Sequence, residues 1–364
     1  GWRTDEARDV GKPTPTSDVR RVYYPEEVSN RLSLGFERPG PGTWSRLSFT
    51  LGWDDYSLTL AKDRFATESS PRDVASSTVD ANDYSIRADA ERPLGEWRMV
   101  VGADISGRYD LQAVNEYTIF GNDGEPIDVD REESVENANG TDLGLFLSLE
   151  RPLGIWQFNF GLRGDGVWSR NTGGFFGDRS TFNSSFSGFA AAGLEIASDL
   201  EVTAQVARGF RDPLLSDRYY RGESGRGFIT GNPDLEPETS LQLDLALRYS
   251  PDSVAVGLYV YRYRISDLIE RFKLGDNYFF RNRGESEITG IELETSFVIG
   301  TGLELNAGAH YLRGEVVDDD SPTDGVPAPG VFMTLRGSPG TRWWWMARGA
   351  AYARDDRPGP TEQE

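Results

Sequence analysis

The sequence predicts an all-β fold, an antiparallel transmembrane β-barrel, and three observations lead to that prediction. First, long stretches alternate strictly between apolar and polar residues. Leu241 to Tyr249 places four leucines on one face and Gln242, Asp244 and Arg248 on the other. Second, short turns and long loops alternate along the chain. Third, only 37% of the residues are hydrophobic and no apolar run reaches about 18 residues. Strands are therefore the membrane-crossing element that the sequence favours.

The first elements are a loop and three hairpins. Residues 1–27 are polar and contain proline, which predicts a loop. Each hairpin has a Pro-Gly turn leading into a strand that opens with tryptophan, at residues 39–44, 93–97 and 152–156. In the strand after the second turn, alternation predicts one face with Trp97, Val101, Ile105, Tyr109 and Leu111.

The strands are long, and pattern counting gives about fourteen of them between Asn30 and Arg354. A tilted membrane strand needs roughly 9–11 residues, so several strands should project beyond the bilayer. Short turns are expected near residues 92, 151, 198–199, 251–252, 299–300 and 338–339. Long loops are expected at about 66–81, 114–139, 170–181, 211–238, 271–284 and 317–330. This asymmetry is typical of an outer-membrane barrel of Gram-negative bacteria, with short periplasmic turns and long extracellular loops.

Composition excludes several function classes. The net charge of -21 argues against nucleic acid as a partner, because phosphate binding needs a basic surface. The chain has no cysteine, so it forms neither a disulfide nor a cysteine metal site. Residue 1 is not methionine and no basic-then-apolar leader follows it, and residues 360–364 have loop character. These features predict an internal piece of a longer protein.

The stretch from Arg208 to Tyr249 is the most distinctive. It contains Arg208-Gly209-Phe210-Arg211-Asp212-Pro213, then a polar and aromatic loop, then Gly231-Asn232-Pro233-Asp234-Leu235-Glu236-Pro237-Glu238. The prolines lack the amide that a central strand needs, so they mark strand ends. We expect Asn232 to close an Asx-type turn and Leu235 to anchor it. A second segment follows, with Phe280-Arg281-Asn282 and then Gly290-Ile291-Glu292.

These two segments, in this order, resemble the barrel signatures of TonB-dependent outer-membrane receptors. The resemblance covers most of the chain, although Asp212 stands where the family more often has a small residue. It implies structural roles for the motif residues Arg208, Gly209, Phe210, Arg211, Pro213, Asn232, Pro233, Leu235, Pro237, Glu238, Asn282, Gly290 and Glu292. It also implies that residues 1–364 are part of a larger barrel of about 22 strands. The plug domain and the segment that contacts the TonB complex would lie outside this chain.

The resemblance implies uptake of a scarce, bulky ligand, most often a ferric siderophore and sometimes a vitamin, haem or glycan. Two loop clusters combine arginine with aromatic residues, which suits an anionic chelate with flat surfaces. The candidate ligand-binding residues are Arg218, Tyr219, Tyr220, Arg221, Tyr278, Phe280, Arg281 and Arg283, and Arg226 and Phe228 lie in the first loop. Loop packing and contact with lipopolysaccharide explain the same residues equally well.

Other functions remain open at this point. They are a passive outer-membrane channel, a soluble acidic glycan-binding β-protein, and a barrel hydrolase that uses His310, the chain's only histidine. His310 is better explained as a polar lumen residue. The acidic run at 122–133 lacks the spacing of a calcium loop and reads as a solvated loop. The sequence therefore predicts no catalytic residue, no metal site and no cofactor.

Overall fold

The computed structural model describes residues 1–12, 20–224, 227–275, 277–300, 302–338, 340 and 342–359. Within them, one sheet contains nineteen strands. Fifteen are long: β1 (Trp2–Gly11), β2 (Arg20–Arg38), β3 (Arg46–Arg64), β4 (Asp73–Leu94), β5 (Trp97–Phe120), β6 (Pro126–Leu153), β7 (Trp156–Asn171), β9 (Arg179–Ala197), β10 (Leu200–Arg211), β13 (Glu238–Tyr249), β14 (Val254–Leu274), β15 (Asn277–Ile299), β16 (Leu303–Val316), β18 (Gly330–Gly337) and β19 (Trp345–Tyr352). The short ones are β8 (Gly173–Gly174), β11 (Arg221–Ser224), β12 (Gly227–Thr230) and β17 (Ser321–Pro322).

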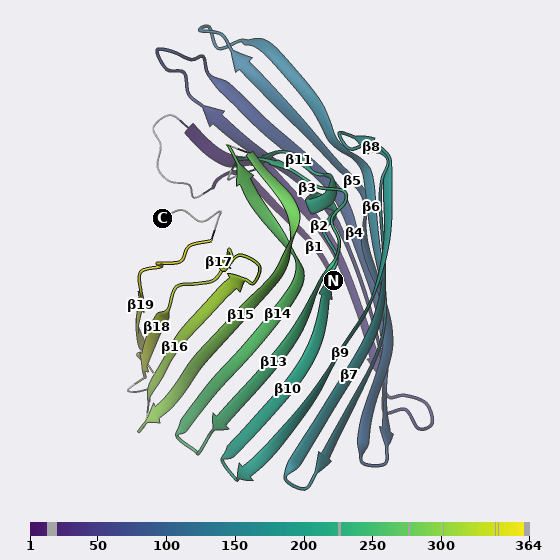
Figure 1. Cartoon of the computed structure of the whole chain (residues 1–364), viewed down its shortest axis with the longest axis vertical. Coiled ribbons are helices and arrows are strands. Elements are labelled where there is room, and N and C mark those ends of the chain that lie inside the picture. The colour runs from purple at the N-terminus through teal and green to yellow at the C-terminus, as the bar shows by residue number, and fades with distance from the viewer. Residues whose placement is uncertain are drawn as a thin grey trace.

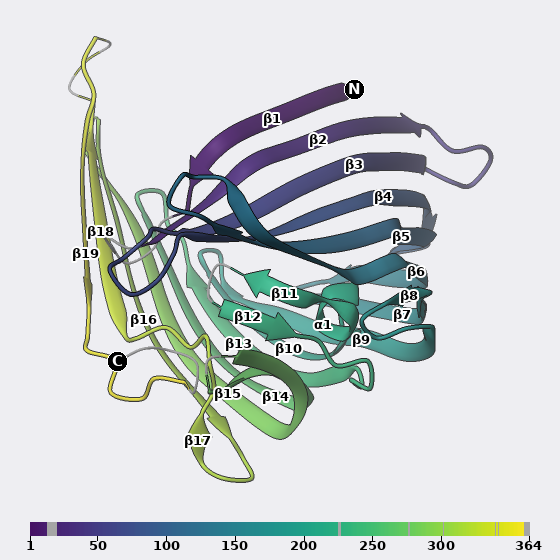
Figure 2. The ribbon, with the colours of Figure 1, turned by 90° about the horizontal axis from the view of Figure 1, so that it is seen from above.

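The long strands form an antiparallel meander in which each pairs with the next. Figure 1 shows the strands tilted and joined by short turns at one rim, and Figure 2 shows a strongly curved, open sheet with β1 and β19 at its ends. Fourteen long strands, β2 to β19, lie wholly or partly between Asn30 and Arg354 in the described residues, as the alternation predicts. The all-β, antiparallel, barrel-type prediction is confirmed.

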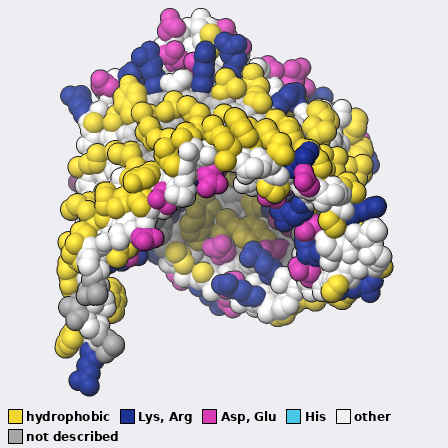
Figure 3. Space-filling view, turned by 90° about the horizontal axis from the view of Figure 1, so that it is seen from below, with side chains coloured by type: hydrophobic (Ala, Val, Ile, Leu, Met, Phe, Trp, Pro, Cys, Tyr) yellow, Lys and Arg dark blue, Asp and Glu magenta, His cyan; other side chains and the backbone are white. Residues whose placement is uncertain are grey.

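The outer face of the curved sheet is apolar. Leu241, Leu243 and Leu245 are each about half exposed there, as expected for side chains that lie against lipid. Figure 3 shows hydrophobic side chains over the outside and charged side chains inside the hollow. On the inner face, Arg163 donates to both carboxylate oxygens of Asp104 at 2.7 and 2.8 Å. For these residues alternation has thus assigned the lipid-facing and lumen-facing sides correctly.

Aromatic side chains mark the height of the apolar band. On β5, Trp97 at the turn end and Tyr109 are twelve residues apart, and on β7, Trp156 and Trp168 have the same spacing. Twelve residues span about 40 Å along a strand, or about 30 Å across the membrane at a tilt near 40°. That height equals the thickness of a bilayer's hydrocarbon core, roughly 30 Å.

Several sequence expectations about loops are wrong. Residues 1–27 contain β1 and the start of β2, which pair from Trp2↔Leu32 to Gly11↔Tyr23. The expected loops at 114–139 and 271–284 are mostly the projecting ends of β5–β6 and β14–β15. Beyond the membrane both faces of these strands meet water or the lumen, so apolar and polar residues no longer alternate although the backbone still pairs.

Leu111 is a further correction, and a β-bulge is its cause. The β5–β6 register shifts between Arg108 and Leu111, and Asp110 there has a φ of 52°. One extra residue reverses the facing of the residues that follow it, up to the next register shift. Leu111 is therefore buried on the inner face, whereas Val101 on the same strand is exposed on the outer face.

The described residues contain one helix, α1 (Leu215–Tyr219), which has five residues. None of the described chain forms a helix of the length and apolarity that a membrane crossing requires.

Candidate functional site

The connection between β10 and β13, residues 212–237, folds into the hollow and is called the inner loop below. It runs through α1, β11 and β12, and its residues 225–226, including Arg226, lie outside the described part. On one side Lys62 of β3 lies 3.3 Å from Glu223 of β11. On the other, β12 pairs in parallel with β15. The inner loop thus bridges two walls on the concave side of the sheet (Figure 2).

The base of the inner loop is closed by Arg218, a predicted ligand-binding residue. Its Nη1 donates to Pro233 O at 3.0 Å and to Leu235 O at 2.6 Å, and its Nη2 lies 3.7 Å from Asp212. Arg218 is 1% exposed and Leu235 is 3% exposed. Burial raises the pKa of Asp212. The hydrogen bond from Asn183 and the positive charge of Arg218 act in the opposite direction and lower it. Arg218 therefore holds the re-entry turn to α1 and presents no surface to a ligand in this conformation.

The motif residues around this base also bind one another. Asn232 Oδ1 accepts from the amide of Asp234 at 3.0 Å, the predicted Asx-type turn. Arg211 pairs with Asp217 and Glu238, both at 3.1 Å. Glu238 also accepts from the amide of Ile269 at 2.9 Å, which ties the start of β13 to β14.

The two sequence motifs meet in space. Asn282 on β15 accepts from the amide of Glu236 and donates to its carbonyl, both at 2.8 Å, as a neighbouring strand would. Asn232 donates to Phe280 O at 3.2 Å. These contacts give a physical reason for the two motifs to occur together: the second holds the first in place.

Tyr219 packs α1 against the wall formed by β4, β5 and β6. It is fully buried in a cluster of small and apolar residues on the inner faces of β4, β5 and β6: Ala81, Leu111, Ala113, Val135 and Ala138. The register shifts that turn Leu111 and Val135 inward create this seat. Sequence reasoning missed it because alternation alone assigns Leu111 to the outer face.

Tyr220 and Arg221 attach the inner loop to β4 and β6. The Tyr220 hydroxyl lies 2.9 Å from Ser77 Oγ and 2.7 Å from Glu223 O, and burial raises the pKa of Tyr220 to about 12. Arg221 pairs with Glu132 at 2.5 Å. The Arg221 guanidinium also lies between two rings, 4.5 Å from the centre of Phe175 and 4.8 Å from that of Phe228. About 29% of the Arg221 side chain is exposed, so this stack faces the hollow.

The second candidate cluster lies on the β14–β15 hairpin. Arg281 and Arg283 share the buried carboxylate of Glu270 at 2.9 and 2.6 Å. Arg283 also pairs with Asp319 at 2.7 Å, while about 45% of the Arg281 side chain stays exposed. Tyr278 is buried beneath Arg271, with 5.1 Å between the guanidinium and the ring centre. Arg281 and the half-buried Phe280 are the accessible members of this cluster.

Phe175 and Glu132 are the main contributors that sequence reasoning missed. They belong to the β7–β9 connection and to β6, far from the inner loop in sequence. The Gly-Gly-Phe-Phe run at 173–176 was the available signal, because two adjacent aromatic residues in a loop indicate a packing or binding role.

The lumen wall below the inner loop carries the remaining motif residues. Tyr261 lies over Gly290, where an added Cβ would sit 2.3 Å from Tyr261 Cζ, and its hydroxyl donates to Glu292 at 2.6 Å. His310 pairs across the sheet with Glu292, and its Nε2 lies 3.0 Å from the backbone oxygen of Ala328. Within the described residues, no group of three or more acidic or histidine side chains is arranged to hold a metal.

A family model, TonB dependent receptor-like, beta-barrel, matches residues 2–362. The chain belongs to the TonB-dependent receptor family. Members of this family are receptors and transporters of the Gram-negative outer membrane that bind extracellular ligands and interact with TonB. The expected localisation is thereby confirmed.

Known relatives are similar over part of their length. A vitamin B12 transporter of Vibrio vulnificus is 28% identical over 148 residues, covering 40% of this chain and 22% of that protein. An iron-regulated outer membrane virulence protein of Vibrio cholerae is 32% identical over 130 residues, covering 31% of this chain and 20% of that protein. These matches span about a fifth of each relative.

Solved structures show the same fold. The copper transporter OprC superposes with a TM-score of 0.78 at 18% identity, over 93% of this chain and 54% of its own. The ferric yersiniabactin uptake receptor FyuA of Yersinia pestis superposes with a TM-score of 0.64 at 16% identity, over 96% of this chain and 54% of its own. The chain thus spans about half the length of these barrels' full chains.

Proposed function

We propose that the full-length protein takes up a bulky, scarce metal chelate, a ferric siderophore, with energy delivered by the TonB complex. A plug domain encoded outside residues 1–364 would fill the hollow and contact TonB, and the lumen carboxylates Glu292 and Glu294 would face it. Family membership supports a receptor over a passive channel. Relatives named for ferric yersiniabactin, ferric enterobactin and ferric citrate support an iron chelate as the ligand class.

The observation that supports an iron chelate as ligand is a pair of surfaces facing the hollow, each of which combines an arginine with aromatic rings. Arg221 between Phe175 and Phe228 lies on one side of the hollow, and Arg281 lies 4.6 Å from the ring centre of Phe272 on the other wall. A flat anionic chelate would gain hydrogen bonds and ring contact at both. Of the other candidates, Arg218, Tyr219, Tyr220 and Tyr278 would act by holding these surfaces in place.

The test uses the full-length receptor and named probes: ferric yersiniabactin, ferric enterobactin, ferric citrate and vitamin B12. Replacing both Arg221 and Arg281 by alanine should weaken binding of one ferric chelate by about tenfold or more, since two charge-assisted contacts are lost. The matched control is Arg170→Ala, which removes an exposed arginine paired with Asp178. Binding of vitamin B12 but of no ferric chelate would contradict the iron assignment, and unchanged affinity in the double variant would contradict the site.

A further inference from the structure

The projecting part of β6 has one side without a neighbouring strand. β7 pairs with β6 only from Asn139 towards the lower turn, and β8 adds a pairing at Val135 and Glu136. Residues 126–133 lie beyond that point. They pair with β5 on one side, and no strand of the described residues pairs with them on the other. This side of residues 126–133 is called the open edge, and such an edge presents backbone donors and acceptors to another chain.

The same side of β6 already accepts backbone hydrogen bonds next to the open edge. The amide of Phe175 donates to Ser134 O and that of Thr172 donates to Glu136 O, both at 3.2 Å. Both donors belong to the connection around β8, which then leaves β6 and leads to β9. The backbone of β6 is therefore exposed for pairing on this side, and the open edge continues the pairing site away from the membrane.

The open edge lies well outside the lipid. Trp168, at the upper end of the apolar band, pairs with Thr141 of β6. Glu133 and Ile127 are eight and fourteen residues beyond Thr141 on the same strand. At a tilt near 40° these positions are about 20–35 Å above the band. Acyl chains therefore do not reach the open edge.

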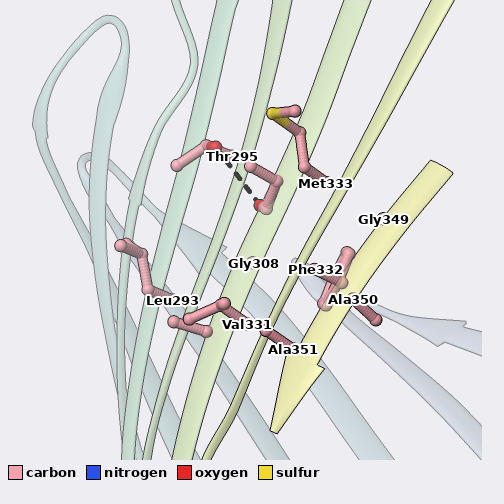
Figure 4. Close-up of a pocket in the computed structure, with 11 residues that line it drawn as sticks. Leu293, Thr295, Gly308, Val331, Phe332, Met333, Gly349, Ala350 and Ala351 are labelled. Atoms are coloured by element: carbon pink, nitrogen blue, oxygen red, sulfur yellow. Dashed lines mark hydrogen bonds between the residues drawn. The ribbon is translucent and has the colours of Figure 1, made fainter. Parts of the chain in front are cut away.

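Exposed apolar residues need a different explanation at this height. Within the apolar band, a hollow of about 520 Å³ across β15, β16, β18 and β19 is lined by Leu293, Val331 and Met333 (Figure 4), and acyl chains of the membrane meet these side chains. Ile127 and Val129 are 67% and 55% exposed, against 53% for both Val331 and Met333, but they lie at the height of water. Exposed apolar side chains on an unpaired strand edge mark a site of association with another chain.

The carboxylates of the open edge share one face of β6. Glu132 faces the hollow, because its carboxylate pairs with Arg221 of the inner loop. The β5–β6 register is continuous over this segment, so Asp130 and Asp128 face the same way and Val129 faces outwards. Both aspartates are exposed. Directly opposite side chains on neighbouring strands are about 4.5–5.5 Å apart, so basic residues at alternate positions of an added strand would pair with both aspartates.

Charge decides which partner fits the open edge. The hairpin segment 114–134 contains seven acidic residues and one basic residue. Two copies of the open edge would place like charges opposite one another, which disfavours pairing between copies and with any acidic strand. An extended polypeptide segment that alternates basic and apolar residues satisfies the backbone, the aspartates and the apolar side chains together.

We propose that the open edge of β6 binds an extended, basic segment of an extracellular polypeptide as an added β-strand. Backbone hydrogen bonds provide the attachment, Asp128 and Asp130 select basic residues, and Ile127 and Val129 contact apolar ones. The added strand would lie above Arg221, which pairs with Glu132 at the lower end of the open edge. The proposal requires that the long hairpins face the outside of the cell, and it is independent of the transported chelate.

The experiment measures the binding of synthetic octapeptides to the full-length receptor in detergent by fluorescence polarisation. The probe alternates lysine with valine. Glutamate in place of lysine should abolish binding. Methylation of every backbone nitrogen of the probe should also abolish it, because the charges remain but the backbone donors are lost. Isotope-edited infrared spectra should show the carbonyls of the bound probe in a β-sheet. Equal binding of the methylated probe would mean that charge alone holds it and would overturn the added strand.

Two receptor variants locate the site. Replacing Asp128 and Asp130 with asparagine should weaken binding of the lysine–valine probe about five- to tenfold, since two cross-strand pairs of opposite charge are lost. The matched control replaces Glu116 and Glu125 with glutamine, which removes the same charge from exposed positions of the same hairpin outside the open edge. It should bind nearly as the unmodified receptor does. Unchanged affinity in the asparagine variant, or an equal loss in the control, would overturn the proposal.

Hydrogen exchange tests for other occupants of the open edge. The amides of residues 127–131 that point away from β5 should exchange rapidly in the free receptor and slowly at saturating probe. Slow exchange without probe would show that a part of the receptor outside residues 1–364 already covers the edge. Slow exchange that increases with receptor concentration would show a second copy there, and either result would overturn the proposal. Heat-modifiable gel mobility reports that each variant has folded.

Discussion

Arg218→Ala should release the inner loop while the barrel stays folded. The Arg218 guanidinium is almost fully buried, donates to two backbone oxygens of the re-entry turn, and lies 3.7 Å from Asp212. The alanine would leave the two oxygens without this donor and the buried carboxylate without its cation. The wall strands take no part in these contacts, so the damage should stay local.

The magnitude follows from the burial. Breaking a buried ion pair from one side costs roughly 3–5 kcal/mol, because the remaining charge has no compensation. The pKa of Asp212 is already raised by burial, so the orphaned carboxyl takes up a proton easily and the lower end, about 3 kcal/mol, applies. That value makes local opening about 150 times more frequent, since each 1.4 kcal/mol is a factor of ten.

Hydrogen exchange in the full-length receptor is the assay. The amides of Gly231 and Asn232 donate to Tyr220 O and Asp217 O, both at 2.8 Å, so they report opening of this turn. The control, Arg170→Ala, removes a pair with Asp178 in which the two side chains are 62% and 69% exposed, and should cost only about 0–1 kcal/mol. Unchanged exchange at both amides in Arg218→Ala, or equal acceleration in the control, would refute this account of the loop.

Three further predictions test the two faces and the loop. Leu245→Arg on the lipid face should cost about 2–4 kcal/mol when folding into lipid vesicles is measured, and lumen-facing Asp244→Arg far less; equal costs would rule out the assigned facing. Gly290→Ala should cost about 1–3 kcal/mol by overpacking against Tyr261, and Tyr261→Ala should recover most of it; additive losses in urea unfolding would contradict the contact. Burial raises the pKa of Tyr220 to about 12, so its stabilisation of the loop is complete below the ordinary value of 10.0 and is lost as pH rises through about 12. The ultraviolet difference between the protein and its Tyr220→Phe variant gives that midpoint, and a value near 10.0 would disprove the burial effect.

The strands and their facing could be predicted because one physical rule controls both. A strand between lipid and lumen alternates with a period of two, and Leu241 to Leu247 follows that period without interruption. Beyond the apolar band the rule no longer applies, because both faces of a strand meet polar surroundings. The projecting ends of β5, β6, β14 and β15 lie there, and the sequence pattern therefore predicted loops for them.

The bulges were invisible to pattern reading for a related reason. Asp110 and Asn137 adopt positive φ values of 52° and 50°, a conformation that aspartate and asparagine tolerate better than most residues. Neither residue is marked in sequence as a bulge, since both types are equally common in polar loops. Yet the bulges at these positions turn Leu111 and Val135 inward and so create the packing site for Tyr219.

Residue type singled out the inner loop as a candidate but could not assign different tasks to its two arginines, because burial decides between them. Arg218 and Arg221 are three positions apart in one loop, and each suits an anion equally well by chemistry. The structure gives Arg218 two backbone oxygens and no exposed surface, and it gives Arg221 two aromatic faces and an opening to the hollow. The partners that make this difference, Leu235 on one side and Phe175 on the other, come from separate segments. Under the proposed function, ligand capture at Arg221 would depend on the closed base at Arg218. Loss of either arginine should then weaken binding by a different route, loss of Arg221 through a missing contact and loss of Arg218 through a disordered loop.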